Sequence, residues 1–177
     1  MRFFATLLGV IVIAVIALAS PLFAAGDRVL TIDGLRPVRI GMTVAAAQRA
    51  LHAKLVALQG PREDACWYAA RAGGVDPGIA YMVERGRITR IDVWVPRQGK
   101  PSAVTSRSGI GIGTAEDEIT RRHGADAFEP HPIAPHGRWA LLEHSDKGGV
   151  RVSITEGRVT GLWAGRRPAL DYSEGCS

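Results

Sequence analysis

Four histidines and three carboxylates lie close together in the second half of the chain, and by residue type they could hold a metal ion. They are His123, His131, His136 and His144, with Glu129, Glu143 and Asp146. Imidazole and carboxylate groups are ligands of zinc and copper sites. Their spacing matches no established metal signature, and Pro130, Pro132 and Pro135 make the segment irregular. We therefore expect no resident metal or cofactor, and a small metal-dependent enzyme is only the third interpretation.

Two further patterns contain catalytic residue types without a catalytic arrangement. The segment 144–146 reads His-Ser-Asp, but adjacent residues at a strand end cannot face one another as base, nucleophile and orienting acid. The glycines that alternate over 109–113 lack the buried strand and crossover helix of a dinucleotide-binding loop. They are better explained as a turn leading into a helix, and we expect a protein that is not an enzyme.

Two cysteines, Cys66 and Cys176, are the only ones in the chain. In an oxidising compartment an isolated pair usually forms a disulfide. We predict a Cys66–Cys176 bond that fastens the C-terminal tail to the first half of the chain. Two free thiols, or pairing between molecules, are the alternatives.

The first 25 residues have the layout of a secretory signal peptide. Arg2 precedes an apolar run from Phe3 to Leu18, and the small residues of segment 24–26 follow. An uncleaved membrane anchor is the alternative, because the run is about long enough to span a bilayer. No cysteine near residue 25 is available for a lipid anchor. We predict a periplasmic or secreted protein whose mature part does not span the membrane.

The charge composition is basic, with 22 Lys and Arg against 17 Asp and Glu. The arginines are scattered along the chain and an exported protein rarely meets nucleic acid, so we expect no nucleic-acid partner. A solvated, arginine-rich surface is the simplest explanation. Attraction to anionic lipid, lipopolysaccharide or an acidic protein is the alternative.

An internal duplication organises the rest of the chain. Ile40-Gly41 matches Ile112-Gly113 at a spacing of about 72 residues, and the segment 83–89 matches 154–160 at about 71. Two matches at nearly one spacing predict two repeats, 28–100 and 101–172, followed by a short tail, 173–177.

Each repeat is predicted to begin with a helix and to continue as an antiparallel meander. Thr43 is a good N-cap for a first helix whose apolar residues recur at helical spacing through Leu55 until the break at 60–61. Thr114 and the acidic residues after it start a second helix, which ends at Gly124. Strands are expected at 66–70, 79–84, 87–95, 139–144, 150–155 and 159–163, joined by tight turns. The predicted class is α+β, with two tandem repeats that each pack a helix or helical pair on a meander.

The sequence Arg39-Ile-Gly-Met-Thr, with the helix and meander after it, resembles the start of the small outer-membrane lipoproteins of the SmpA/OmlA family. The tandem form is similar to the secreted β-lactamase inhibitor proteins. This resemblance implies a helical pair on a four-stranded sheet, duplicated into a broad concave sheet that grips a partner protein. The lipid-anchor cysteine of the lipoproteins is missing and no inhibitor loop is identifiable, so no binding residue is carried over. The segment 169–177 also resembles the ends of exported bacterial proteins of uncharacterised function.

All four tryptophans fall on predicted strands, where most aromatic residues pack a core. Some could instead stand on an open sheet face, since aromatic residues and arginines dominate protein interfaces. Candidate partner-binding residues are Trp94 and Trp139 with Arg90, Arg138 and His136. We predict a non-enzymatic binding module for an envelope or secreted protein; a carbohydrate or surface-glycan binder is the alternative.

Overall fold

The computed structural model describes residues 28–58 and 65–176. The predicted signal peptide and the predicted helix break at 60–61 lie outside these residues. The described chain contains two α-helices, a large antiparallel sheet and a small sheet, which confirms the α+β class.

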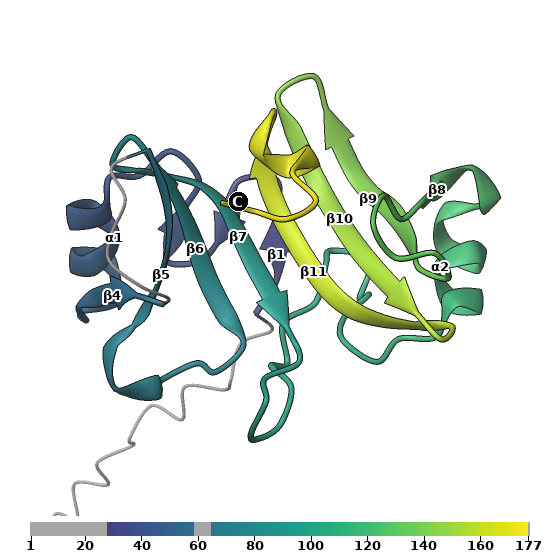
Figure 1. Ribbon diagram of the computed structural model, residues 1–177, viewed down its shortest axis with the longest axis horizontal. Coiled ribbons are helices and arrows are strands. Elements are labelled where there is room, and N and C mark those ends of the chain that lie inside the picture. Colours follow the sequence, from purple (N-terminus) through teal and green to yellow (C-terminus); the bar gives the residue numbers. More distant parts are fainter. Residues whose placement is uncertain (1–27, 59–64, 177) are drawn as a thin grey trace, which may run out of the picture.

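The large sheet has eight strands in the order β4-β5-β6-β7-β11-β10-β9-β8, and every neighbouring pair is antiparallel. The first four run as one meander and the last four as another, and the two meet where β7 pairs with β11 (Figure 1). Because both meanders end at the centre, β4 and β8 form the outer edges. The strands are β4 (Leu55–Ala57), β5 (Cys66–Arg71), β6 (Ile79–Glu84), β7 (Arg87–Trp94), β8 (Phe128–Pro130), β9 (Arg138–Ser145), β10 (Gly148–Thr155) and β11 (Arg158–Arg166).

A small sheet precedes the first helix and was not predicted. Its strands β1 (Leu30–Thr31), β2 (Gly34–Leu35) and β3 (Val38–Arg39) contain only two residues each, too few to show a period in the sequence. Val29 forms a parallel bridge with Thr105, so this N-terminal sheet is joined to the connection between the two meanders.

The first helix, α1 (Val44–Leu51), begins as predicted but ends earlier. The Thr43 hydroxyl caps it by accepting from the Ala46 N–H. His52 then adopts a left-handed conformation, and the Gln48 side chain accepts from the Leu55 N–H at 2.9 Å. The extension of this helix to Leu55 is therefore wrong. That residue keeps its buried position because it opens strand β4.

The second helix, α2 (Glu116–His123), is followed by Gly124 at its C-cap, as predicted. Its N-cap is Ala115 and not Thr114, because the Thr114 hydroxyl accepts from the Gly111 N–H in the preceding turn. Three 3-10 turns complete the elements: η1 (Ala72–Gly74), η2 (Ala125–Ala127) and η3 (Ala169–Asp171).

The chain approaches both helices through the same set of backbone contacts. Gly41 N–H donates to the Ile88 carbonyl at 2.7 Å, and Gly113 N–H donates to the Val159 carbonyl at 2.8 Å. In the reverse direction, the Ile88 N–H donates to the Met42 carbonyl, and the Val159 N–H donates to the Thr114 carbonyl. The Arg87 side chain donates to the Gly41 carbonyl, and the Arg158 side chain donates to the Gly113 carbonyl in the same way.

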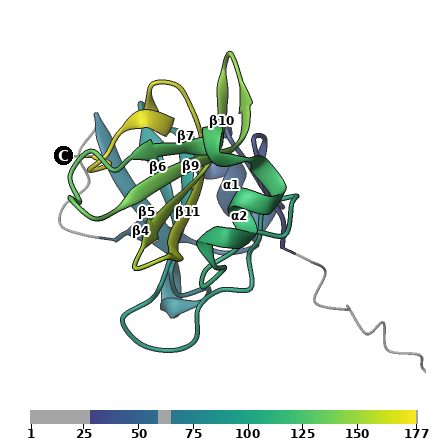
Figure 2. The ribbon, with the colours of Figure 1, turned by 90° about the vertical axis from the view of Figure 1, so that its right-hand side faces the viewer.

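The main core lies against one face of the large sheet. Alternating residues of the strands, such as Ile91 and Leu162, point into it, together with Ala47 of α1 and Ile119 of α2. Buried residues of the small sheet, including Leu30, belong to the same cluster. Both helices therefore cover the same side of the sheet (Figure 2). The opposite face of the sheet carries other types of side chain, and predicted binding residues lie on it.

Candidate binding site

The second face of the large sheet carries arginine, aspartate and tryptophan side chains. On β7 the core-facing Ile91 and Val93 alternate with Arg90, Asp92 and Trp94. The C-terminal segment, residues 167–176, turns back from β11 and lies across part of this face (Figure 1). It divides the face into a covered half and an uncovered half.

Leu170 anchors the C-terminal segment in the covered half. Its side chain is fully buried and packs with Trp139, Trp163 and Leu141 in a second apolar cluster. The indole N–H of Trp163 donates to the Leu170 carbonyl at 3.0 Å. An apolar contact and a polar contact therefore hold the same residue of the segment.

Arg90 holds the segment by its backbone. The guanidinium donates to the carbonyls of Ala169 at 3.0 Å and Tyr172 at 2.7 Å, and it pairs with Asp92 at 2.6 Å. Burial lowers the pKa of Arg90, but the charge and hydrogen bonds of Asp92 outweigh burial and raise it. The arginine is only 7% exposed. The predicted partner contact Arg90 therefore lies beneath the C-terminal segment, which covers it.

The Tyr68 hydroxyl completes this network by donating to Asp92 at 2.6 Å. Burial, followed by the nearby Asp92 charge, strongly raises the pKa of Tyr68. The phenol therefore stays protonated and acts as a fixed donor.

Arg151 is a second buried arginine under the segment, with 3% of the residue exposed. Its guanidinium lies 4.7 Å from the ring centroid of Trp139 and pairs with Glu129 at 3.2 Å and Asp171 at 3.1 Å. Trp139 also makes edge contacts with the rings of His131 and Trp163, and it is 6% exposed. The predicted partner contact Trp139 is therefore enclosed by these neighbours and is not exposed on the sheet face.

The predicted disulfide is confirmed and closes the covered half. Cys66 on β5 is bonded to Cys176, with 5.4 Å between the Cα atoms. The preceding Gly175 has a φ of +69°, and a Cβ there would lie 2.5 Å from the Tyr68 hydroxyl oxygen. Only glycine allows the segment to pass this closely over β5 before the disulfide.

The uncovered half contains small residues beside Trp94. Gly161 on β11 pairs with Trp94, and Ser153 on β10 pairs with Gly161, so the three residues form a row across the strands. All three are partly exposed. A Cβ placed on Gly161 would make ordinary van der Waals contacts, the nearest at 3.6 Å from the Ser153 Cβ, so no atom crowds this glycine.

Arg138 and His136 do not join Trp94. Arg138 is exposed, and its guanidinium lies 4.5 Å over the Phe128 ring and pairs with Glu116 of α2. His136 is exposed in the loop before β9. Of the five predicted partner-binding residues, Trp94 is the one in the uncovered half of the face.

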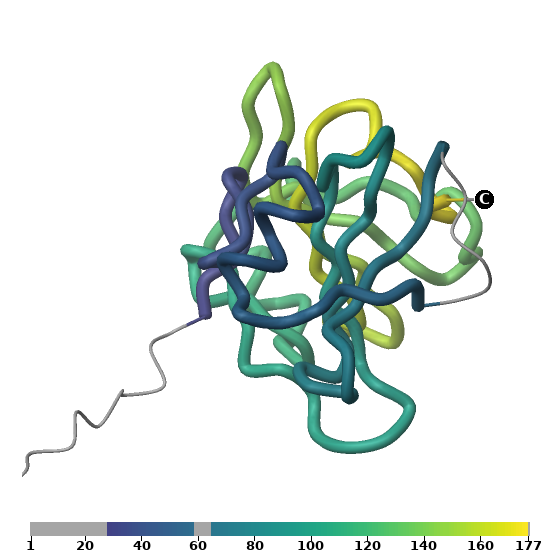
Figure 3. Tube along the Cα trace, turned by 90° about the vertical axis from the view of Figure 1, so that its left-hand side faces the viewer, coloured from purple at the N-terminus to yellow at the C-terminus, as the bar shows by residue number. Residues whose placement is uncertain are grey.

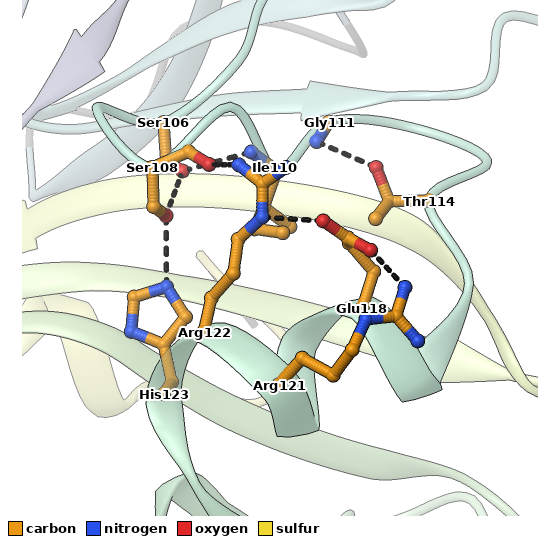
Figure 4. Close-up of polar contacts among 9 residues, drawn as sticks. All are labelled: Ser106, Ser108, Ile110, Gly111, Thr114, Glu118, Arg121, Arg122 and His123. Atoms are coloured by element: carbon orange, nitrogen blue, oxygen red, sulfur yellow. Dashed lines mark hydrogen bonds and ion pairs between the residues drawn. The ribbon is translucent and has the colours of Figure 1, made fainter.

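His123 fastens a loop to α2. Its Nε2 forms a 2.8 Å hydrogen bond with the Ser108 hydroxyl, while Arg122 donates to the Ser108 carbonyl (Figure 4). Burial and the neighbouring Arg122 lower the pKa of His123, and Glu143 acts weakly in the opposite direction. This histidine is therefore neutral at pH 7 and has a structural partner.

His131 also has a local structural role. Its Nδ1 accepts from the N–H groups of Ile133 and Ala134 at 3.2 and 3.0 Å, and burial lowers its pKa. Within residues 28–58 and 65–176, no group of three His, Cys, Asp or Glu side chains is placed to hold a metal ion.

Comparison with known proteins adds no relative: no family model matches the chain, and no curated protein or solved structure matches it either. In the described part of the chain, no helix is long and apolar enough to cross a membrane.

Proposed function

We propose that the protein is an exported, non-catalytic binding module that contacts another protein of the bacterial envelope or exterior. The uncovered half of the sheet face is its contact surface. The observation that carries this proposal is the partly exposed Trp94 beside the small, partly exposed residues Gly161 and Ser153. A large aromatic side chain next to small residues is the kind of anchor on which interface hot spots form.

The rest of the face supports such a surface by being rigid. Strand β7 beside Trp94 is held on one side by β6 and on the other by β11. The buried Arg90–Asp92 pair lies on the same strand, one and two side-chain positions away on the same face. A partner therefore meets a preformed surface, which reduces the conformational entropy lost on binding.

We further infer that the two meanders with their helices are copies of one unit. The sequence matches at spacings of about 72 and 71 residues fall where the paired backbone hydrogen bonds lie. The hairpin turns carry Arg85-Gly86 in one unit and Glu156-Gly157 in the other, with φ positive at all four residues. These parallels support the tandem organisation and the resemblance to inhibitor proteins that use a duplicated sheet.

The test is capture of a partner from native envelope and secreted extracts, followed by a direct affinity measurement with the purified partner. The bait is the mature protein after export, with its disulfide oxidised. Trp94→Ala is expected to weaken the affinity at least tenfold, because it removes the proposed anchor. Ile133→Ala is the matched control, since Ile133 is 56% exposed and lies in the loop before β9.

Circular dichroism must first show that both variants are folded. Equal capture by the Trp94→Ala variant, the Ile133→Ala variant and the unaltered protein would refute the proposed contact surface. Absence of any captured protein with a folded, monodisperse bait would refute the protein-binding role.

A further inference from the structure

A pocket of about 380 Å³ lies at the N-terminal small sheet and is lined by four arginines. We propose that this arginine pocket binds a phosphate group. Its charged lining residues are Arg28, Arg36, Arg39, Arg107 and Asp33. It lies with the small sheet, which is on the opposite side of the molecule from the C-terminal segment (Figure 3). The inference therefore does not depend on the proposed contact surface around Trp94.

Backbone pairing brings Arg107 next to three arginines that lie close together in the sequence, between residues 28 and 39. The Leu30 N–H donates to the Thr105 carbonyl and the Thr105 N–H donates to the Arg28 carbonyl, so Arg28 and Arg107 lie on paired segments. Arg36 is in the turn between β2 and β3, and Arg39 ends β3. Arg107, which is distant in the sequence, thus joins Arg28, Arg36 and Arg39 around one cavity.

The loop that carries Arg107 is fixed by side chains of α2. Gly109 N–H donates to the Ser106 carbonyl and closes a turn over residues 106–109. Arg122 and His123 hold this turn at Ser108, as Figure 4 shows. Arg107 therefore projects from a braced turn, which limits the freedom that its backbone would lose on binding a ligand.

The floor of the pocket is also preformed. Leu35 and Val38 line it and are buried in the main core. Gly34 has a φ of +125°, and a Cβ there would lie 2.6 Å from the Val38 carbonyl oxygen. The close approach of β2 and β3 requires glycine at this position. The backbones of the two strands therefore pack directly against each other in the floor of the pocket.

Two of the four arginines already have acidic partners. Arg28 pairs with Asp76 at 2.6 Å, and Arg107 lies 3.6 Å from Glu143. Arg36 and Arg39 are exposed, and neither side chain makes a hydrogen bond or ion pair with any residue that the structure describes. Asp33 is the one acidic residue among the described residues that line the pocket. The pocket therefore contains two guanidinium groups without an ion-pair partner among the described residues and two that already have one.

This arrangement favours a phosphate group over a single carboxylate. Each guanidinium offers a planar fork of donors that suits two oxygens of a phosphate, and several forks can share its oxygens. With Asp33 counted, the two free arginines leave a net charge of +1 in the lining, which is opposite in sign to the charge of a phosphate monoester. The cavity volume is at the lower end of small-ligand sites, so the phosphate could belong to a soluble ester or to a phospholipid headgroup.

The experiment titrates inorganic phosphate into the oxidised protein and follows backbone and arginine side-chain NMR signals at low ionic strength. The altered protein carries Arg36→Ala and Arg39→Ala. The control carries Arg49→Ala and Arg97→Ala, which removes the same charge from exposed arginines outside the pocket. We expect saturable shifts at residues of the small sheet and turn 106–109, an affinity at least tenfold weaker in the pocket variant, and a change within twofold in the control.

A second arm identifies the source of the phosphate by co-sedimentation with vesicles. Binding to vesicles that contain phosphatidic acid, but not to phosphatidylcholine vesicles, with loss in the pocket variant, assigns the site to a lipid headgroup. Binding to inorganic phosphate alone assigns it to a soluble ligand. Equal weakening in both double variants overturns the proposal, and so does the absence of both a saturable shift with inorganic phosphate and binding to phosphatidic acid vesicles.

Discussion

The two halves of the large sheet share a backbone plan but stabilise it with different side chains. In both halves a glycine N–H bonds to the last strand of the meander, and an exposed arginine bonds to that glycine's carbonyl. The helices that follow differ: α1 reads Val-Ala-Ala-Ala-Gln-Arg-Ala-Leu, whereas α2 reads Glu-Asp-Glu-Ile-Thr-Arg-Arg-His. The backbone contacts are therefore common to both halves, whereas the two helix sequences differ around one buried residue each, Ala47 and Ile119.

The two buried arginines of the sheet also differ, in how completely their partners are enclosed. Arg90 of the first half is satisfied by Asp92 and two backbone carbonyls, all in a nearly closed site. Arg151 of the second half pairs with Glu129 and Asp171, whose side chains are 49% and 35% exposed, and its Nε has no hydrogen-bond partner among the described residues. Both arginines hold the C-terminal segment, but the first is the more completely enclosed.

The largest effect is expected from the disulfide that joins the first half of the sheet to the C-terminal segment. Replacing Cys66 and Cys176 by serine removes a crosslink between residues 110 positions apart. We expect a loss of about 4 kcal/mol in the free energy of unfolding, because the crosslink restricts the unfolded chain. Urea unfolding of oxidised protein and of the double variant measures it. A loss below about 1 kcal/mol would show that the noncovalent contacts of the segment suffice.

Removing the two arginines separately tests which half holds the segment more strongly. Arg90→Ala leaves Asp92 without its cation in a poorly hydrated site, and we expect a loss of about 3 kcal/mol. Arg151→Ala leaves partners that water can reach, and we expect about 1 to 2 kcal/mol. The same unfolding assay measures both. Equal losses would contradict the difference in enclosure between the two sites.

Substitution of the residues that cap the two helices is expected to have a smaller effect on the free energy of unfolding. Thr43→Ala removes the cap of α1 and should cost about 1 kcal/mol. Ala115→Ser adds a hydroxyl where α2 has an extended N-cap residue without a side-chain bond, and it should stabilise by about 0.5 to 1 kcal/mol. Thermal unfolding of the two variants tests the pair. A destabilising Ala115→Ser would show that the acidic first turn of α2 already satisfies its start.

The smallest effect is a pH dependence confined to the second half. Because the pKa of His123 is lowered in the folded protein from its usual value of 6.5, the unfolded chain takes up this proton first as pH falls. Stability should therefore decrease from pH 7 toward the lowered pKa, and it should not fall further from this residue below that pKa. Comparing His123→Gln with unaltered protein over pH 7 to 5 isolates the contribution. His136→Gln is the control, and an unchanged slope in His123→Gln would contradict it.

The strands that the sequence predicted are those long enough to alternate several times. Segment 87–94 shows this pattern and forms β7, whereas segment 79–84 is a continuous apolar run that forms the fully packed strand β6. The short strands β1 to β4 and β8 offer no such period, so their pairing had no local signal. The helix boundary was misplaced for a related reason: Leu55 continues the helical spacing, but the left-handed His52 and the Gln48 side chain end the helix first.

The candidate site was only partly predictable. Alternation correctly grouped Arg90, Asp92 and Trp94 on one face of β7, because the period of side chains along a strand is two. It could not show that residues 167–176 would cover two of the predicted contacts. Leu170 and Gly175 carried the available signal, since an apolar residue and a glycine precede a cysteine that must reach Cys66.

The sequence by itself determined the α+β class, the long meander strands, the disulfide pair and the helix stop at Gly124. These features depend on residue type and on neighbours close in the chain, or on there being only two cysteines. The tertiary structure decided which face of the sheet is covered, which tryptophan stays accessible and which arginines share a pocket. Those outcomes depend on contacts such as Arg90 with Tyr172 and Arg28 with the segment before Arg107. Such contacts join residues about 80 positions apart, and no local pattern specifies them.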